Sequence, residues 1–212
     1  MTRVLLAGGI IAGPLYLLVG LIEILIRPGF DVTRHELSLM SLGDRGWIQI
    51  TSFIVTGLLV IGGAIGMRSV IRSGRGRIWG PLLIGLFGLG LIAAGIFVPD
   101  PINGFPPGMP QSTAPSWHAL LHLVSGAIGF TGLIVACFIF ARRFGDLGER
   151  GWSIYSLVTG ILFLAAFIGI ASGAQLPVLV IGFYLGVIIG FAWISALSAR
   201  MLRDAGSLAL ST

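Results

Sequence analysis

Long apolar runs constrain this chain more than any other feature of its sequence. Each run is about as long as the roughly 20 residues that a helix needs to cross the hydrocarbon layer of a bilayer. The sequence therefore predicts an all-α fold, a polytopic transmembrane bundle of six helices. We expect these helices at about residues 4–26, 47–67, 78–98, 117–140, 152–172 and 177–200, with Gln175 and Pro177 marking the last turn.

The composition agrees with a membrane protein and limits the number of domains. Only 10% of the 212 residues are charged and the mean hydropathy is +1.01, whereas soluble domains carry roughly 25% charged residues. Six spans and their connections use nearly all of the chain. We therefore expect one integral membrane domain over residues 1–212, with no separate soluble catalytic domain.

The distribution of arginine predicts the orientation in the membrane. All 13 basic residues are arginine, and the connections on the side of the two termini hold ten of them, against three on the opposite side. An excess of basic residues marks cytoplasmic loops, so both termini are expected in the cytoplasm. The ten are Arg3, Arg68, Arg72, Arg75, Arg77, Arg142, Arg143, Arg150, Arg200 and Arg203; the three are Arg27, Arg34 and Arg45.

Charge and cysteine content also bound the partners. The arginines are scattered between apolar segments and form no continuous basic patch beside aromatic residues, so a nucleic-acid partner is not expected. Membrane lipids with anionic headgroups are the expected partners. Cys137, the only cysteine, falls within an apolar run, which excludes an intrachain disulfide and a cysteine zinc site.

Tryptophan marks the predicted span boundaries. Trp47, Trp79, Trp117 and Trp152 each stand at the start of a span, where an amphipathic ring prefers the headgroup level. The alternative interpretation is that these rings pack inside the protein.

Glycine pairs spaced four residues apart predict close helix contacts. Such small residues let helix backbones approach within a bilayer. Packing within the bundle is favoured, and a homo-oligomer through the same faces is the alternative. The pairs are Gly9/Gly13, Gly62/Gly66 and Gly186/Gly190.

Polar residues gather in or beside two long connections, residues 27–46 and 99–116, both predicted to face outward. All three histidines lie there. An outward-facing pocket built from these connections is the candidate binding site. Its candidate residues are Glu23, His35, Ser38, Asp100, His118 and His122.

The spacing of His118 and His122 permits metal binding. Residues at i and i+4 lie on one helix face and can supply two ligands to one ion. Asp100 is the candidate third ligand and zinc the candidate cofactor. The alternative is that both histidines are polar caps that hydrogen-bond loop carbonyl groups.

Glu23 stands inside the first span, where a carboxylate is costly unless it faces the bundle interior and finds a partner. Arg27 follows one helical turn later. Two interpretations fit: a local ion pair at i and i+4, or a polar site within the bundle.

The first connection contains a helix-start pattern. Thr33 and Glu36 have the spacing of a capping box, which predicts a short surface helix over residues 34–42. In this interpretation Glu36 is a cap. Ser38 is then a surface residue, or a nucleophile if His35 comes within hydrogen-bond reach as its base.

Short motifs in and beside the two long connections stand at residues 27–31 (RPGFD), 35–38 (HELS), 42–43 (LG), 99–101 (PDP) and His118-x3-His122. Together they resemble the domain of unknown function 998 (DUF998) membrane family over nearly the whole chain. The resemblance implies a six-helix prokaryotic protein of the cytoplasmic membrane whose shared polar residues lie on the outer side, Ser38, Asp100, His118 and His122 among them, without an established activity. Ala119 stands where the family pattern has glycine.

Two classes of function fit these residues. The leading hypothesis is binding of a small molecule, a lipid headgroup or an ion in the outer pocket. The alternative is a membrane-embedded metal-dependent hydrolase of a lipid or amide, in which a histidine-bound ion activates water. Its ingredients resemble those of the alkaline ceramidase and progestin receptor superfamily, which has seven helices. Transport ranks lower because Glu23 is the one acid within the spans, and a structural role is the remaining alternative.

Overall fold

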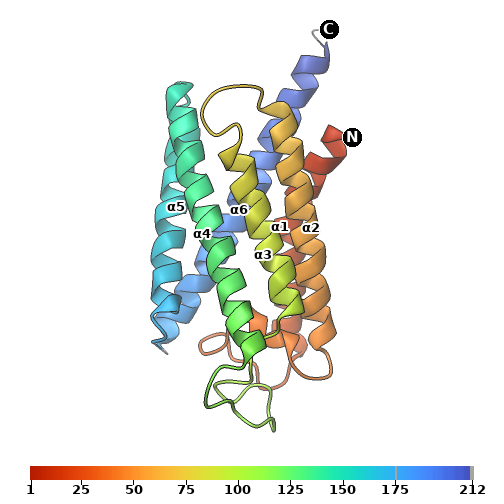
Figure 1. The fold of residues 1–212 in the computed structure, drawn as a ribbon, viewed down its shortest axis with the longest axis vertical. Helices are drawn as coiled ribbons and strands as arrows, with labels where there is room; N and C mark the ends of the chain where they lie inside the picture. Colours follow the sequence, from red (N-terminus) through yellow and green to blue (C-terminus); the bar gives the residue numbers. More distant parts are fainter. Residues whose placement is uncertain (175, 211–212) are drawn as a thin grey trace.

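The computed structural model describes residues 1–174 and 176–210, with side chains as far as residue 206. Its six long helices are all long and apolar enough to cross a membrane, which confirms the predicted fold class; Gln175 of the predicted last turn lies outside the described residues. The helices are α1 (Thr2–Ile26), α2 (Gly46–Val70), α3 (Trp79–Ile96), α4 (Trp117–Asp146), α5 (Arg150–Ala171) and α6 (Pro177–Leu210), with a short 3-10 helix η1 (Leu37–Ser41) after α1 (Figure 1).

The helices form a closed ring. Each one packs against the next along the chain, and α6 returns to pack against α1. Both termini lie at one end of the bundle, here named the terminal end, and the two long loops, 27–45 and 97–116, lie at the opposite, loop end (Figure 1). The polar residues of the two predicted outward connections are therefore brought to the same end.

Helix boundaries differ from the predictions mainly at the ends of α4 and α6, which continue to Asp146 and Leu210 instead of residues 140 and 200, and by less at α3. The third helix ends at Ile96, two residues before the predicted limit, because Pro99 disfavours helical geometry at the residue before it. The sixth continues to Leu210 because good helix formers follow residue 200. Because α3 ends early, Phe97 and Val98 belong to the second loop.

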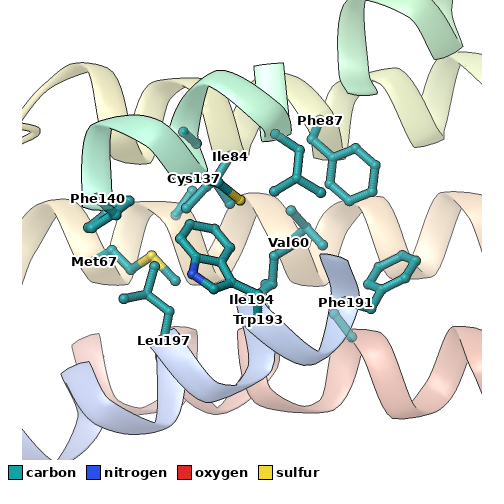
Figure 2. Packing of buried hydrophobic residues seen from close by; sticks show 14 of the residues in the cluster. Val60, Met67, Ile84, Phe87, Cys137, Phe140, Phe191, Trp193, Ile194 and Leu197 are labelled. Carbon is teal, nitrogen blue, oxygen red and sulfur yellow. The ribbon is translucent and has the colours of Figure 1, made fainter. Parts of the chain in front are cut away.

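The core lies at the centre of the ring. Trp193 of α6 is fully buried, and its ring packs edge-on against Phe140 at 5.6 Å between centroids. Its indole N–H donates a 3.0 Å hydrogen bond to Ser156 Oγ. Cys137 is also fully buried within this cluster (Figure 2). The outer helix faces carry exposed aliphatic side chains instead, as a lipid environment requires.

Glycine permits the closest helix approaches. A Cβ on Gly9 would lie 3.1 Å from the backbone of Gly63 and even nearer to Ser198, and one on Gly186 would lie 2.8 Å from the Ala166 side chain. These positions are filled by other helices of the same chain, as the packing interpretation expected.

Three of the four boundary tryptophans point away from the protein. Trp47, Trp79 and Trp117 are 63–69% exposed, which fits a ring at headgroup level. Trp152 instead packs against Phe144 with 5.6 Å between ring centroids. The belt interpretation therefore fits three positions, and packing explains the fourth.

Candidate functional site

His35 connects the two loops at the loop end. The Asp31 N–H donates to its Nδ1 at 2.9 Å, so the proton of the neutral ring lies on Nε2, which donates to the Asn103 carbonyl at 3.0 Å. The Tyr184 hydroxyl of α6 donates to the His35 carbonyl at 2.7 Å. One residue therefore holds the first loop, the second loop and α6 together.

Aromatic side chains surround this histidine. The His35 ring lies 5.4 Å from the Phe30 ring and 5.3 Å from the Phe105 ring, and Phe105 is 1% exposed. Phe105 also packs with Leu39 and Leu42 in a small core separate from that of the bundle, with Phe30 against it. Both ring nitrogens of His35 are engaged by backbone groups, so neither accepts a proton from Ser38, which is partly buried in η1.

The capping box predicted in the first loop is wrong. Thr33 donates from both its N–H and its hydroxyl to Asp31 Oδ1, at 2.8 and 2.7 Å, because an aspartate two residues earlier offers a closer acceptor in a tight turn. The helix is limited to Leu37–Ser41, and Glu36 precedes it without a capping hydrogen bond from its side chain. Glu36 is therefore not used as a cap.

Asp100 fixes the start of α4. It accepts from the Ser116 N–H at 2.6 Å and from the Ser116 hydroxyl at 2.8 Å, and Ser116 Oγ accepts from the Ala119 N–H as the N-cap. The bond from the Ser116 backbone is the main cause that holds the pKa of Asp100 below its ordinary value. His118 Nε2 lies 3.8 Å from Asp100 Oδ1.

Both histidines of α4 donate to carbonyl groups at or just beyond the carboxyl end of α3. His118 Nδ1 donates to the Val98 carbonyl at 2.9 Å, and His122 Nδ1 donates to the carbonyls of Ala94 and Phe97 at 3.1 and 2.7 Å. The last carbonyls of a helix have no partner within it. The geometry is that of polar caps joining α3 to α4.

Of the three predicted metal ligands, two side chains lie close to each other in the structure. His118 and Asp100 are adjacent, but no group of three histidine, cysteine, aspartate or glutamate side chains able to hold an ion occurs among the described residues. A zinc site of His118, His122 and Asp100, and the hydrolase that depends on it, stay predictions.

Glu23, in the last two turns of α1, is fully buried. Its Oε1 lies 4.0 Å from Arg27 Nη1, which fits the ion-pair interpretation, and Arg27 Nη2 donates to the Leu42 carbonyl. Deeper in the bundle, Gln49 donates to the Tyr16 hydroxyl at 3.3 Å. A buried polar strip therefore runs along the α1–α2 contact.

A cavity of about 200 Å³ opens at the loop end beside the turn between α5 and α6. Arg34, Glu36 and Asn103 supply its polar groups, while Ile170 and Val180 are among its apolar residues. Neither Arg34 nor Asn103 was predicted from the sequence as a site residue. Asn103 has a positive φ of 61°, and its place before Gly104 is the turn signal that could have drawn attention to it.

The electrostatics of the cavity depend on two opposite charges. Burial is the main cause that raises the pKa of Glu36 above its ordinary value, because a carboxylate loses hydration there. Arg34 is exposed. No salt bridge joins Arg34 or Glu36 to another of the described residues. The cavity thus presents a carboxyl group and a guanidinium group that do not pair with each other.

Comparison with known proteins identifies a family and nothing more specific. A family model described as a protein of unknown function (DUF998) matches residues 10–200. No curated protein and no solved structure matches the chain.

We expect Glu23→Gln to destabilise the protein because it leaves the Arg27 guanidinium buried without its carboxylate. Breaking a buried pair from one side costs more than replacing both partners. The double variant Glu23→Gln/Arg27→Met should therefore be more stable than the sum of the two single changes, by about 2 kcal/mol. Thermal unfolding in detergent measures this, and additive effects would show that the two side chains do not stabilise each other.

We expect Asp100 to contribute to the stability of the fold in a pH-dependent way. Its folded pKa is lowered, so ionised Asp100 stabilises the fold above the ordinary aspartate pKa of about 4 and loses this effect as the pH falls through the lowered value. Asp100→Asn should lower the melting temperature at pH 7, and the difference from wild type should shrink toward pH 3. Asp44→Asn, a change at an exposed acid of the first loop, is the control. A difference that stays constant with pH would contradict this role.

Proposed function

Because the chain belongs to the DUF998 family, whose description assigns no activity, we propose its function from its geometry: it binds a small zwitterion in the cavity at the loop end. The observation that carries the proposal is that Glu36 and Arg34 line one cavity without pairing with each other. A ligand with an ammonium and an anionic group would complete both.

The size of the cavity limits the ligand. Its volume of about 200 Å³ is below the roughly 300–1,000 Å³ of pockets for drug-sized molecules. A compact molecule with a short spacer between its charges fits this space. Asn103 adds a side-chain amide, and Ile170 and Val180 add apolar wall. A phosphoethanolamine group, free or as the headgroup of a phospholipid, has this chemistry.

The contacts around His35 support binding without large rearrangement. Its bonds to Asp31 and Asn103 hold the two loops together, and Asn103 in turn donates to the Arg34 carbonyl at 3.3 Å. Arg34 and Glu36 flank His35 directly in the chain. Such fixed geometry reduces the entropy lost when a ligand binds. In this proposal His35 is a positioning residue.

The unequal distribution of arginine between the two ends of the bundle indicates which side of the membrane the cavity faces. The terminal end carries ten arginines against three acidic residues, a net charge of +7, whereas the loop end carries three arginines against five acidic residues, a net of −2. A strongly basic end is typical of the cytoplasmic side. We propose that the cavity faces outward from the cytoplasmic membrane of a prokaryote.

The test uses purified protein in detergent and measures binding by calorimetry. We expect phosphoethanolamine to bind, and Glu36→Gln and Arg34→Gln each to weaken its affinity about tenfold, because each removes a charge-assisted hydrogen bond. Asp44→Asn and Arg45→Gln, which remove an acid and an arginine of the same loop outside the cavity, should leave the affinity unchanged.

A second arm separates the two sources of the ligand. Native mass spectrometry after exposure to phosphatidylethanolamine tests the headgroup, and Ala174→Phe tests occupancy because it fills the cavity without changing a charge. No binding of either compound, or equal losses in the loop controls, would overturn the proposed function.

A further inference from the structure

A second cavity lies at the terminal end, between the ends of α2, α4 and α6. Its volume is about 290 Å³. Its wall is largely apolar, with Val70, Ile71, Leu147 and Met201, and two guanidinium groups line it, those of Arg143 and Arg200. Leu147 is 55% exposed, so this wall continues to the surface of the protein.

Arg200 is already neutralised within the protein. It forms an ion pair with Glu149, and its Nε lies 3.8 Å from Asp204 Oδ2, a residue that also lines the cavity. Its guanidinium lies over the Phe144 and Trp152 rings, 4.7 and 5.1 Å from their centroids. Arg200 therefore serves mainly to join α6 to the ends of α4 and α5.

Arg143 is held in place without being neutralised. Its Nη1 donates to the carbonyls of Ser73 and Arg75, at 2.8 and 2.9 Å. No carboxylate of the described residues forms a salt bridge with it. A guanidinium has five N–H donors, and the bonds within the described chain come from Nη1 alone. The donors on Nε and Nη2 are left for an anion.

The loop that accepts these bonds, between α2 and α3, has two glycines in the left-handed conformation. Gly74 and Gly76 have φ of +81° and +78°, values that other residues rarely adopt. A Cβ on Gly74 would lie 3.2 Å from Arg143 Nη1. The loop thus turns its carbonyls toward Arg143 and fixes the direction of the guanidinium.

We propose that this cavity binds the phosphate of an anionic phospholipid, with Arg143 as the charged contact and the apolar wall against the start of the acyl chains. The net charge of +7 at this end attracts anionic headgroups to the same level of the membrane. A lipid is favoured over free phosphate because five apolar side chains, those of Val70, Ile71, Phe144, Leu147 and Met201, line the cavity beside the arginine.

The experiment measures lipid retention. Full-length protein is reconstituted in nanodiscs of phosphatidylcholine with one fifth phosphatidylglycerol, extracted into detergent and analysed by native mass spectrometry. We expect wild type to retain phosphatidylglycerol over phosphatidylcholine, and Arg143→Gln to lower that preference about fivefold, the equivalent of about 1 kcal/mol.

Two further variants separate the cavity from general basic charge. Arg142→Gln removes the neighbouring exposed arginine, which does not line the cavity, and should leave the preference unchanged. Leu147→Trp fills the cavity while keeping every charge, and should lower the preference even if Arg143→Gln fails to fold. Equal losses in Arg142→Gln and Arg143→Gln, or no loss in Leu147→Trp, would overturn the proposal. Displacement of the lipid by millimolar inorganic phosphate would reassign the site to a free anion and overturn the lipid assignment.

Discussion

The imidazole of His35 joins parts of the protein that are far apart in sequence, and the geometry of the loop end depends on it. The ring accepts from the Asp31 N–H and donates to the Asn103 carbonyl, and the backbone carbonyl of His35 accepts from the Tyr184 hydroxyl. Without this ring, the Asp31 N–H of the first loop and the Asn103 carbonyl of the second loop would each need another hydrogen-bond partner. Because a single buried side chain satisfies both loops, Arg34, Glu36 and Asn103 come to line one cavity.

The two ends of the bundle handle charge in different ways. At the loop end, buried or partly buried polar groups are organised by hydrogen bonds to backbone, as Asp100 is with Ser116. At the terminal end, arginine is in excess, and Arg143 is oriented by carbonyl groups that leave its charge in place. The closed ring of apolar helices separates these two regions. A small polar ligand at one end and an anionic lipid at the other are consistent with that division.

Much of the fold could be predicted from sequence because the bilayer imposes it. The length of the apolar runs was enough to predict the six spans, and Pro99 accounts for the early end of α3. The candidate site was less predictable, because it depends on which acceptor each polar group meets. The spacing of Thr33 and Glu36 suggested a cap, but Asp31 competed for Thr33 and left Glu36 to line the cavity. Asn103 reaches the site only because two distant loops meet, and no local pattern encodes that contact.

Hydrogen exchange measured by mass spectrometry on wild type and His35→Phe tests most directly whether His35 holds the two loops together. Phenylalanine keeps an aromatic ring among Phe30 and Phe105 but removes both hydrogen bonds of the imidazole. We expect exchange to accelerate together in residues 28–36 and 99–108, although the two segments are far apart in sequence. Acceleration confined to residues 28–36, with the second loop unchanged, would contradict the claim that His35 holds the loop end together.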